Sequence, residues 1–225
     1  MDNTSGYISL GPQKLHYIKS GNGSKALIAF HGYGGDARLL LPIAAYLNDV
    51  FTVYSIGGRV CLKIAEQVPE CIDKVVLIAS DGLAFNPFYY FVTRTTPGKF
   101  LFSSFLTNPL KYMPVVEWAK KRNLVDGSRY KFAMQYLKAE QDRTFLLKVW
   151  PCMAHIIPDY KRLKHAVDIH QIPIHLFMGA YDKVIPISLA YRFCDDIPNT
   201  SLHIIEKGHR VFDQDTMPQI AQCFF

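Results

Sequence analysis

Three short loops of the sequence carry residue types that together support nucleophilic catalysis. Ser55 stands two residues before a pair of glycines, Asp182 ends a Gly-Ala-Tyr-Asp run, and His209 follows Gly208. A serine hydroxyl becomes a strong nucleophile when an imidazole takes its proton, and a carboxylate can orient that imidazole. The residue types therefore predict a nucleophile, a base and an orienting acid, provided that the fold brings the three loops together.

Predicted strands precede all three loops. Apolar runs typical of buried strands occupy residues 26–30 and 75–79, and further strands are predicted at 50–54, which is β-branched and aromatic, at 174–178 and at 201–205. Helical patterns follow at residues 36–47, 59–68, 187–194 and from 214 onward, and a hairpin is expected over residues 7–18. This alternation predicts an α/β fold with a mostly parallel sheet and helices on both faces, in which ligands bind beyond the carboxyl ends of the strands.

Between residues 83 and 170 the strand pattern is replaced by helical patterns. We therefore expect a helical cap inserted between two core segments, residues 1–82 and 171–225. From residue 94 to 164 there are 14 Lys and Arg against 5 Asp and Glu, whereas the rest of the chain has 11 against 14. This charge fits either a solvated helical face or attraction of an anionic substrate, and no nucleic-acid-binding motif accompanies it.

Taken in order, these motifs resemble those of the α/β-hydrolase family over nearly the whole chain. The matching segments are HGxGG at 31–35, SxGG at 55–58, GxxDxxxP at 179–186 and GH at 208–209. The run at 55–59, SIGGR, is also similar to the corresponding turn of the menaquinone-pathway synthase and of C–C bond hydrolases in this family.

The resemblance implies an α/β-hydrolase fold and an enzyme that cleaves a small or medium ester, or a C–C bond. It implies that Ser55 is the nucleophile, His209 its general base and Asp182 the orienting acid. The backbone N–H groups of Tyr33 and Ile56 would form the oxyanion hole. It implies a small-molecule substrate, with neither a metal nor an organic cofactor.

One feature departs from the family pattern. The family has glycine two residues before the serine, where this chain has Val53, and only 24 positions separate His31 from Ser55. The family places a further strand, helix and strand there, and a βαβ unit takes roughly 30 or more residues. We therefore expect a missing βαβ segment near residues 54–57, through a real deletion or a join of two separate stretches. We favour the join, which predicts an over-long Cα–Cα step between Thr52 and Gly58 and a strand's width of empty sheet.

Three alternatives stay open. A real deletion would leave a catalytically inactive binding protein. The GxGxxA pattern at 32–37 is typical of dinucleotide-binding enzymes, although no acid follows at the end of the next strand. Asp81, also at the end of a predicted strand, is a second candidate for the orienting acid.

The composition limits the remaining possibilities. With 225 residues, 49% of them hydrophobic and 20% charged, the chain is typical of a globular protein. The start lacks a signal-peptide pattern and no apolar run approaches the ~20 residues of a membrane span, so we expect a soluble cytoplasmic protein without membrane or nucleic-acid partners. The five cysteines contain no CxxC pair, and His155, His165 and His170 lack ligand spacing, so no zinc site is expected.

Overall fold

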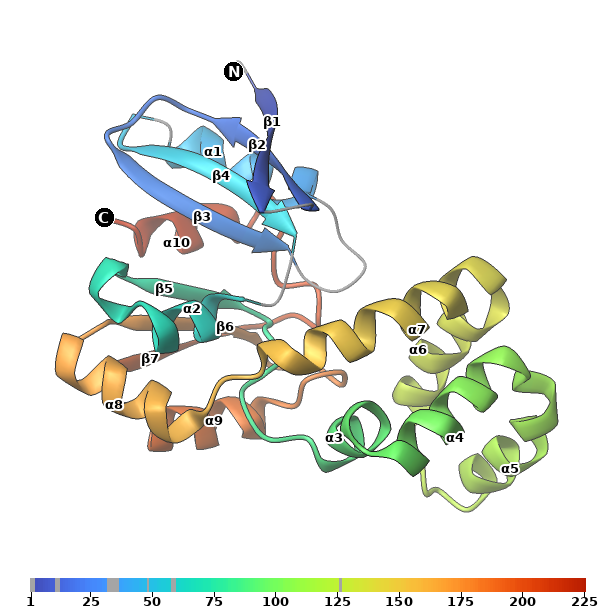
Figure 1. Cartoon of the computed structure of the whole chain (residues 1–225). Coiled ribbons are helices and arrows are strands. Elements are labelled where there is room, and N and C mark those ends of the chain that lie inside the picture. The colour runs from blue at the N-terminus through green and yellow to red at the C-terminus, as the bar shows by residue number, and fades with distance from the viewer. Residues whose placement is uncertain (1–2, 11–12, 32–36, 48, 58–59, 126) are drawn as a thin grey trace.

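The computed structural model describes residues 3–10, 13–31, 37–47, 49–57, 60–125 and 127–225. It shows an α/β core with helices on both faces and a separate group of helices extending to one side (Figure 1). Among the described residues, none of the helices combines the length and hydrophobicity needed to span a bilayer.

The first sheet has four strands in the order β1-β2-β4-β3. Their bounds are β1 Thr4–Leu10, β2 Gln13–Ser20, β3 Lys25–His31 and β4 Phe51–Gly57. Strands β1 and β2 form the expected antiparallel hairpin, β2 is also antiparallel to β4, and β3 and β4 are parallel.

The second sheet has three parallel strands in the order β5-β6-β7. Their bounds are β5 Val75–Ile78, β6 Ile174–Gly179 and β7 Thr200–Ile205. Most of β6 is buried on both faces, which explains its nearly continuous apolar sequence and its central position. The insertion separates β5 from β6 in sequence, yet the two strands are neighbours in the sheet.

Helices cover the two faces of the core. On one face lie α1 (Leu41–Leu47), preceded by a 3₁₀ turn at Ala37–Leu40, and α10 (Met217–Gln222). Their apolar side chains pack with those of β4, and with Phe177 and Ile205 of the second sheet. On the other face lie α2 (Cys61–Gln67), followed by a 3₁₀ turn at Pro69–Cys71, α8 (Tyr160–His170) and α9 (Ile187–Asp196).

The described residues of the inserted region form helices joined by turns, without a strand. It contains α3 Pro87–Arg94, α4 Thr96–Thr107, α5 Pro109–Lys121, α6 Gly127–Lys138, α7 Glu140–Met153 and a 3₁₀ turn at Ala154–Ile156. The side chains of Asn86 and Thr95 accept N–H bonds in the first turns of α3 and α4. Helix α8 belongs to the core, because Leu163 and Val167 are buried against the second sheet. The group of helices outside the core therefore consists of α3 to α7.

Strand β4 continues further along the chain than the sequence patterns predicted. A break was expected at Ser55, but β4 continues to Gly57 in register with β3, where Ala29 is the partner of Ser55 and His31 the partner of Gly57. This unbroken register excludes an over-long Cα–Cα step between Thr52 and Gly57. The step to Gly58, and Gly58 itself, lie outside the described residues.

The core contains two separate sheets, which agrees with the expected strand's width of empty sheet and not with one continuous sheet. Among the described strands, β3 pairs only with β4, and β5 pairs only with β6. Ile28 of β3 is 50% exposed. The division falls between β3 and β5. The described residues between β4 and β5 form the α-helix α2 and a 3₁₀ turn, and none of them forms a strand that could hydrogen-bond to both edges.

Candidate active site

The side chains of Asp182 and His209 form a hydrogen-bonded pair. His209 Nδ1 lies 2.8 Å from Asp182 Oδ2. The Asp182 side chain has no solvent exposure, whereas that of His209 is 41% exposed. With the Nδ1 hydrogen donated to the carboxylate, Nε2 becomes the basic nitrogen of the neutral ring. This is the arrangement that a general base and its orienting acid require.

The turn after β6 fixes the Asp182 carboxylate. Its second oxygen, Oδ1, accepts the backbone N–H groups of Val184 at 2.8 Å and Ile185 at 2.9 Å. The N–H group of Asp182 donates to the carbonyl of Gly179 at 3.2 Å. Both carboxylate oxygens are therefore engaged, so the ring of His209 meets a buried acceptor of fixed direction.

The loops that carry the two residues are bonded to each other. The N–H group of Tyr181 donates to the carbonyl of Lys207 at 3.0 Å, and its hydroxyl donates to Glu206 at 2.6 Å. The hydrogen bond to Glu206 and the charge of that carboxylate raise the pKa of Tyr181. Because β6 and β7 are adjacent and parallel, the loops after them leave the same edge of the sheet.

Lys207 forms ion pairs with two carboxylates in the chain after His209. Lys207 Nζ contacts the carboxylates of Asp213 at 2.5 Å and Asp215 at 3.4 Å. The hydrogen bond that Lys207 donates to the Asp213 carboxylate raises the pKa of Lys207 and lowers the pKa of Asp213. These contacts hold the segment between β7 and α10, in which His209 lies.

The predicted nucleophile lies in a different setting. The backbone of Ser55 is part of β4, two residues before its end, with β2 on one side and β3 on the other. The strand-to-helix elbow expected at residues 54–58 is therefore wrong for the described part of that segment, because strand pairing continues through it. Ile56 also lies in β4, opposite Phe30, and the predicted oxyanion residue Tyr33 lies outside the described residues.

The second candidate acid follows the end of β5 by three residues. Asp81 is half-buried there, and its carbonyl accepts the hydroxyl hydrogen of Ser80 at 2.9 Å. The backbone at this strand end is unusual, since Ala79 has a φ of 42° and Gly82 a φ of 83°. The carboxylate that contacts His209 is that of Asp182.

The sequence motifs identified Asp182 and His209 but not the contact that brings their loops together. Gly179 ends β6, and a Cβ at this position would lie 2.2 Å from the carbonyl oxygen of Gly208. In the sequence, the only indication of this close contact is the glycine at position 179, and glycine also occurs in many turns for other reasons.

The comparisons with known proteins return hydrolases. No family profile matches the chain. The chain is 25% identical over 207 residues to the uncharacterized hydrolase YugF of Bacillus subtilis strain 168, a match that covers 85% of this chain and 70% of YugF.

Solved structures resemble the chain over almost its whole length. One is the 2-hydroxy-6-oxo-6-phenylhexa-2,4-dienoate hydrolase of Rhodococcus sp. strain RHA1, with a TM-score of 0.61, 17% identity and 99% of each chain covered. Another is an esterase from Exiguobacterium antarcticum, with a TM-score of 0.51, 11% identity and 94% of each chain covered. An α/β fold family hydrolase from Bacillus anthracis strain Sterne has a TM-score of 0.54, 14% identity and 99% of each chain covered. The chain therefore has the α/β-hydrolase fold, as the order of its sequence motifs predicted.

Proposed function

We propose that the chain hydrolyses a small or medium ester, or a C–C bond next to a carbonyl, with His209 as general base and Asp182 as its orienting acid. The observation that carries this proposal is the contact of 2.8 Å between His209 and the buried Asp182 carboxylate. Enzymes with this fold perform acyl transfer at the carboxyl edge of the parallel sheet, and they use a fixed His–Asp pair there. The names of the sequence relative and of the structural neighbours support the same reaction class.

Ser55 is the nucleophile of this proposal. His209 Nε2 takes the proton of the serine hydroxyl as the oxygen attacks the substrate carbonyl, and the imidazolium then gives that proton to the leaving group. The Asp182 carboxylate stabilises the imidazolium in between. The N–H groups of Tyr33 and Ile56 donate to the oxyanion of the tetrahedral intermediate.

The position of Ser55 sets a condition on this chemistry. Figure 1 shows the ends of β3, β4 and β5 directed to the same side, so the end of β4 points toward the edge at which ligands bind. Ser55 lies inside the strand ladder, two residues before this end. Attack by its hydroxyl therefore requires the last residues of β4 to leave the ladder and form the turn that the sequence predicts.

The test is turnover of a p-nitrophenyl ester by the full chain and by the variants Ser55→Ala and His209→Ala. We expect turnover in the wild type and its loss in both variants. Ser201→Ala, at an exposed serine in β7, and His165→Ala, at an exposed histidine in α8, are matched controls that keep full activity. Loss in His209→Ala alone would show that His209 activates water directly and would remove Ser55 from the mechanism.

A second candidate function is ligand binding without catalysis. The division of the core between β3 and β5 favours it, because no described strand pairs with both edges and Ser55 lies inside β4. In that case the wild type folds but shows no turnover above that of His209→Ala. Tight binding of NADP(H) would instead support a nicotinamide-dependent enzyme.

A further inference from the structure

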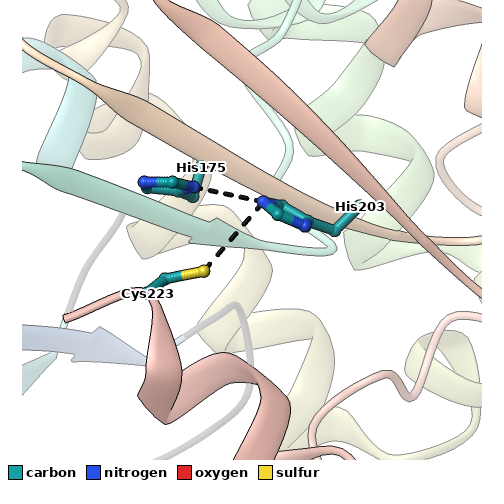
Figure 2. Close-up of side chains that lie close together, drawn as sticks. All are labelled: His175, His203 and Cys223. Carbon is teal, nitrogen blue, oxygen red and sulfur yellow. Dashed lines mark hydrogen bonds between the residues drawn. The ribbon is translucent and has the colours of Figure 1, made fainter. Parts of the chain in front are cut away.

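Three potential metal ligands meet on the core face that α10 covers. His175 Nδ1 lies 3.1 Å from His203 Nε2, and Cys223 Sγ lies 4.0 Å from the same nitrogen. All three ligand atoms lie within 4.8 Å of one another, and all three residues are half-buried. Figure 2 shows the side chains converging from two strands and from the end of a helix.

The fold holds the two histidines on one face of the second sheet. His175 is the second residue of β6, and its register partner in β7 is Ser201, two residues before His203. The two side chains are therefore diagonal neighbours, which is within reach for imidazole rings. The ring of Phe177 stacks on that of His203, with centroids 4.4 Å apart and planes 12° apart, and so restricts its rotation.

Cys223 comes from the C-terminal end of α10. Its backbone carbonyl accepts a hydrogen bond from Lys74 Nζ, which fixes the end of the helix beside the amino end of β5. The next residue, Phe224, packs edge-on against Phe51 of β4, with centroids 6.0 Å apart. The segment that carries the thiol thus contacts both sheets.

The distances are close to those of a zinc site. Zinc binds imidazole nitrogen at about 2.0–2.1 Å and thiolate sulfur at about 2.3 Å in a tetrahedron, so two nitrogens lie about 3.3 Å apart and a nitrogen and a sulfur about 3.6 Å apart. The two histidine nitrogens already meet this spacing at 3.1 Å. The thiol lies 4.0 Å from His203 Nε2 and within 4.8 Å of His175 Nδ1, so zinc binding requires it to move closer to both rings by rotation about the Cα–Cβ bond of Cys223 and a small backbone adjustment.

The protonation state of one of the three groups, the His175 ring, already suits a cation. Burial, together with the nearby His203 and Lys74, lowers the pKa of His175, which keeps its ring neutral and its lone pair available. Burial raises the pKa of the Cys223 thiol, although the charge of Lys74 opposes this. Metal binding therefore has to release the thiol proton to solvent.

We propose that His175, His203 and Cys223 bind one Zn²⁺ ion, with water as the fourth ligand. The ion would tie β6 and β7 to the segment that packs on β4, and so would stabilise the junction of the two sheets. The site is separate from Asp182 and His209, because His175 lies near the amino end of β6 and Asp182 follows its carboxyl end. The proposal is independent of the proposed hydrolase activity.

The first test is metal binding by the full chain after treatment with a chelator. Calorimetric titration with Zn²⁺ should give one site, and Co²⁺ should give the near-ultraviolet charge-transfer band of a cobalt–thiolate bond. Cys223→Ser should abolish that band and weaken Zn²⁺ binding at least tenfold, and His203→Asn should weaken binding by a similar factor. Cys194→Ser, at a half-buried cysteine on α9, is the matched control and should leave both signals unchanged.

The second test needs no substitution, so a variant that fails to fold does not weaken it. Alkylation of the wild-type chain by iodoacetamide is followed at each cysteine by peptide mass spectrometry, with and without Zn²⁺. We expect Zn²⁺ to slow alkylation of Cys223 at least tenfold while the exposed Cys71 reacts at its former rate. Equal protection of both cysteines, no protection of Cys223, or a cobalt band that persists in Cys223→Ser would overturn the proposal.

Discussion

Gly179 and Gly208 lie so close together that only one of them can accept a side chain. A Cβ at Gly179 would lie 2.2 Å from the carbonyl oxygen of Gly208, whereas a Cβ at Gly208 would meet no atom within 4 Å. Through this contact, the loop that carries Asp182 packs closely against the loop that carries His209. The difference between the two glycines provides a direct test of this packing.

Gly179→Ala should force the two loops apart. Because the clash is with backbone, which cannot rotate away, we expect a loss of about 1–3 kcal/mol in the free energy of unfolding. The contact between His209 and Asp182 should lengthen as well, so ester turnover should fall. Gly208→Ala is the control and should change both quantities little. Urea unfolding and initial rates measure them, and equal effects of the two substitutions would contradict the packing described here.

Asp182→Asn should separate the orienting role of the carboxylate from its structural role. The amide oxygen can still accept the N–H groups of Val184 and Ile185, so we expect the fold to persist. The amide cannot stabilise an imidazolium, and kcat should fall by about 10⁴-fold, the size of effect that loss of the orienting carboxylate has in a Ser-His-Asp triad. Asp81→Asn is the control. If kcat fell in Asp81→Asn and not in Asp182→Asn, Asp81 would be the orienting acid.

Glu66 should make stability depend on pH in the acid range. Its buried carboxylate accepts bonds from Lys63 at 2.8 Å and from the N–H group of Asp159 at 2.8 Å, which links α2 to the start of α8. Burial alone raises the pKa of Glu66, but the bonds from Lys63, Asp159 and Gln67 outweigh it and hold the pKa below its ordinary 4.5.

A lowered pKa in the folded state stabilises the protein at pH values above 4.5, and this contribution is lost as pH falls through the folded-state pKa. Glu66→Gln should therefore cost about 1–3 kcal/mol at neutral pH and should unfold with a weaker acid dependence than the wild type. Glu70→Gln, at an exposed position, is the control. Urea unfolding at several pH values measures both effects. Parallel pH profiles for the wild type and Glu66→Gln would rule out this role.

The basic charge of the inserted helices should favour substrates with a carboxylate. Exposed charges are screened over about 10 Å at 0.1 M salt, so attraction of an anionic ester should weaken as salt is added. We expect kcat/KM for a carboxylate-bearing ester to exceed that for its neutral analogue at low salt, and the difference to shrink at high salt. Equal kcat/KM values for the two esters at both salt concentrations would show that these lysines and arginines only face solvent.

Local sequence patterns were sufficient for most of the individual elements. The runs at 75–79, 174–178 and 201–205 predicted β5, β6 and β7 within one residue. The signal was clearest for β6, because a strand buried on both faces leaves a continuous apolar sequence. The helical patterns of the insertion were equally clear. The loops of Asp182 and His209 followed from these strands, since parallel strands bring their carboxyl ends to one edge.

The sequence by itself thus determined the order of strands and helices, the fold class and the loops that carry Asp182 and His209. Tertiary structure decided the rest. Whether Ser55 starts a turn or extends a strand depends on pairing with β2 and β3, which are distant in sequence. Helix α8 joins the core through the buried side chains of Leu163 and Val167, which its local pattern alone did not reveal.

The cluster of His175, His203 and Cys223 shows the same limit most clearly. The three residues are separated by 28 and 20 positions and form no motif. Their meeting depends on the register between β6 and β7 and on the packing of α10. Periodicity reports which face of an element is buried, but contacts between elements are set by long-range pairing and packing, which no local stretch of sequence records.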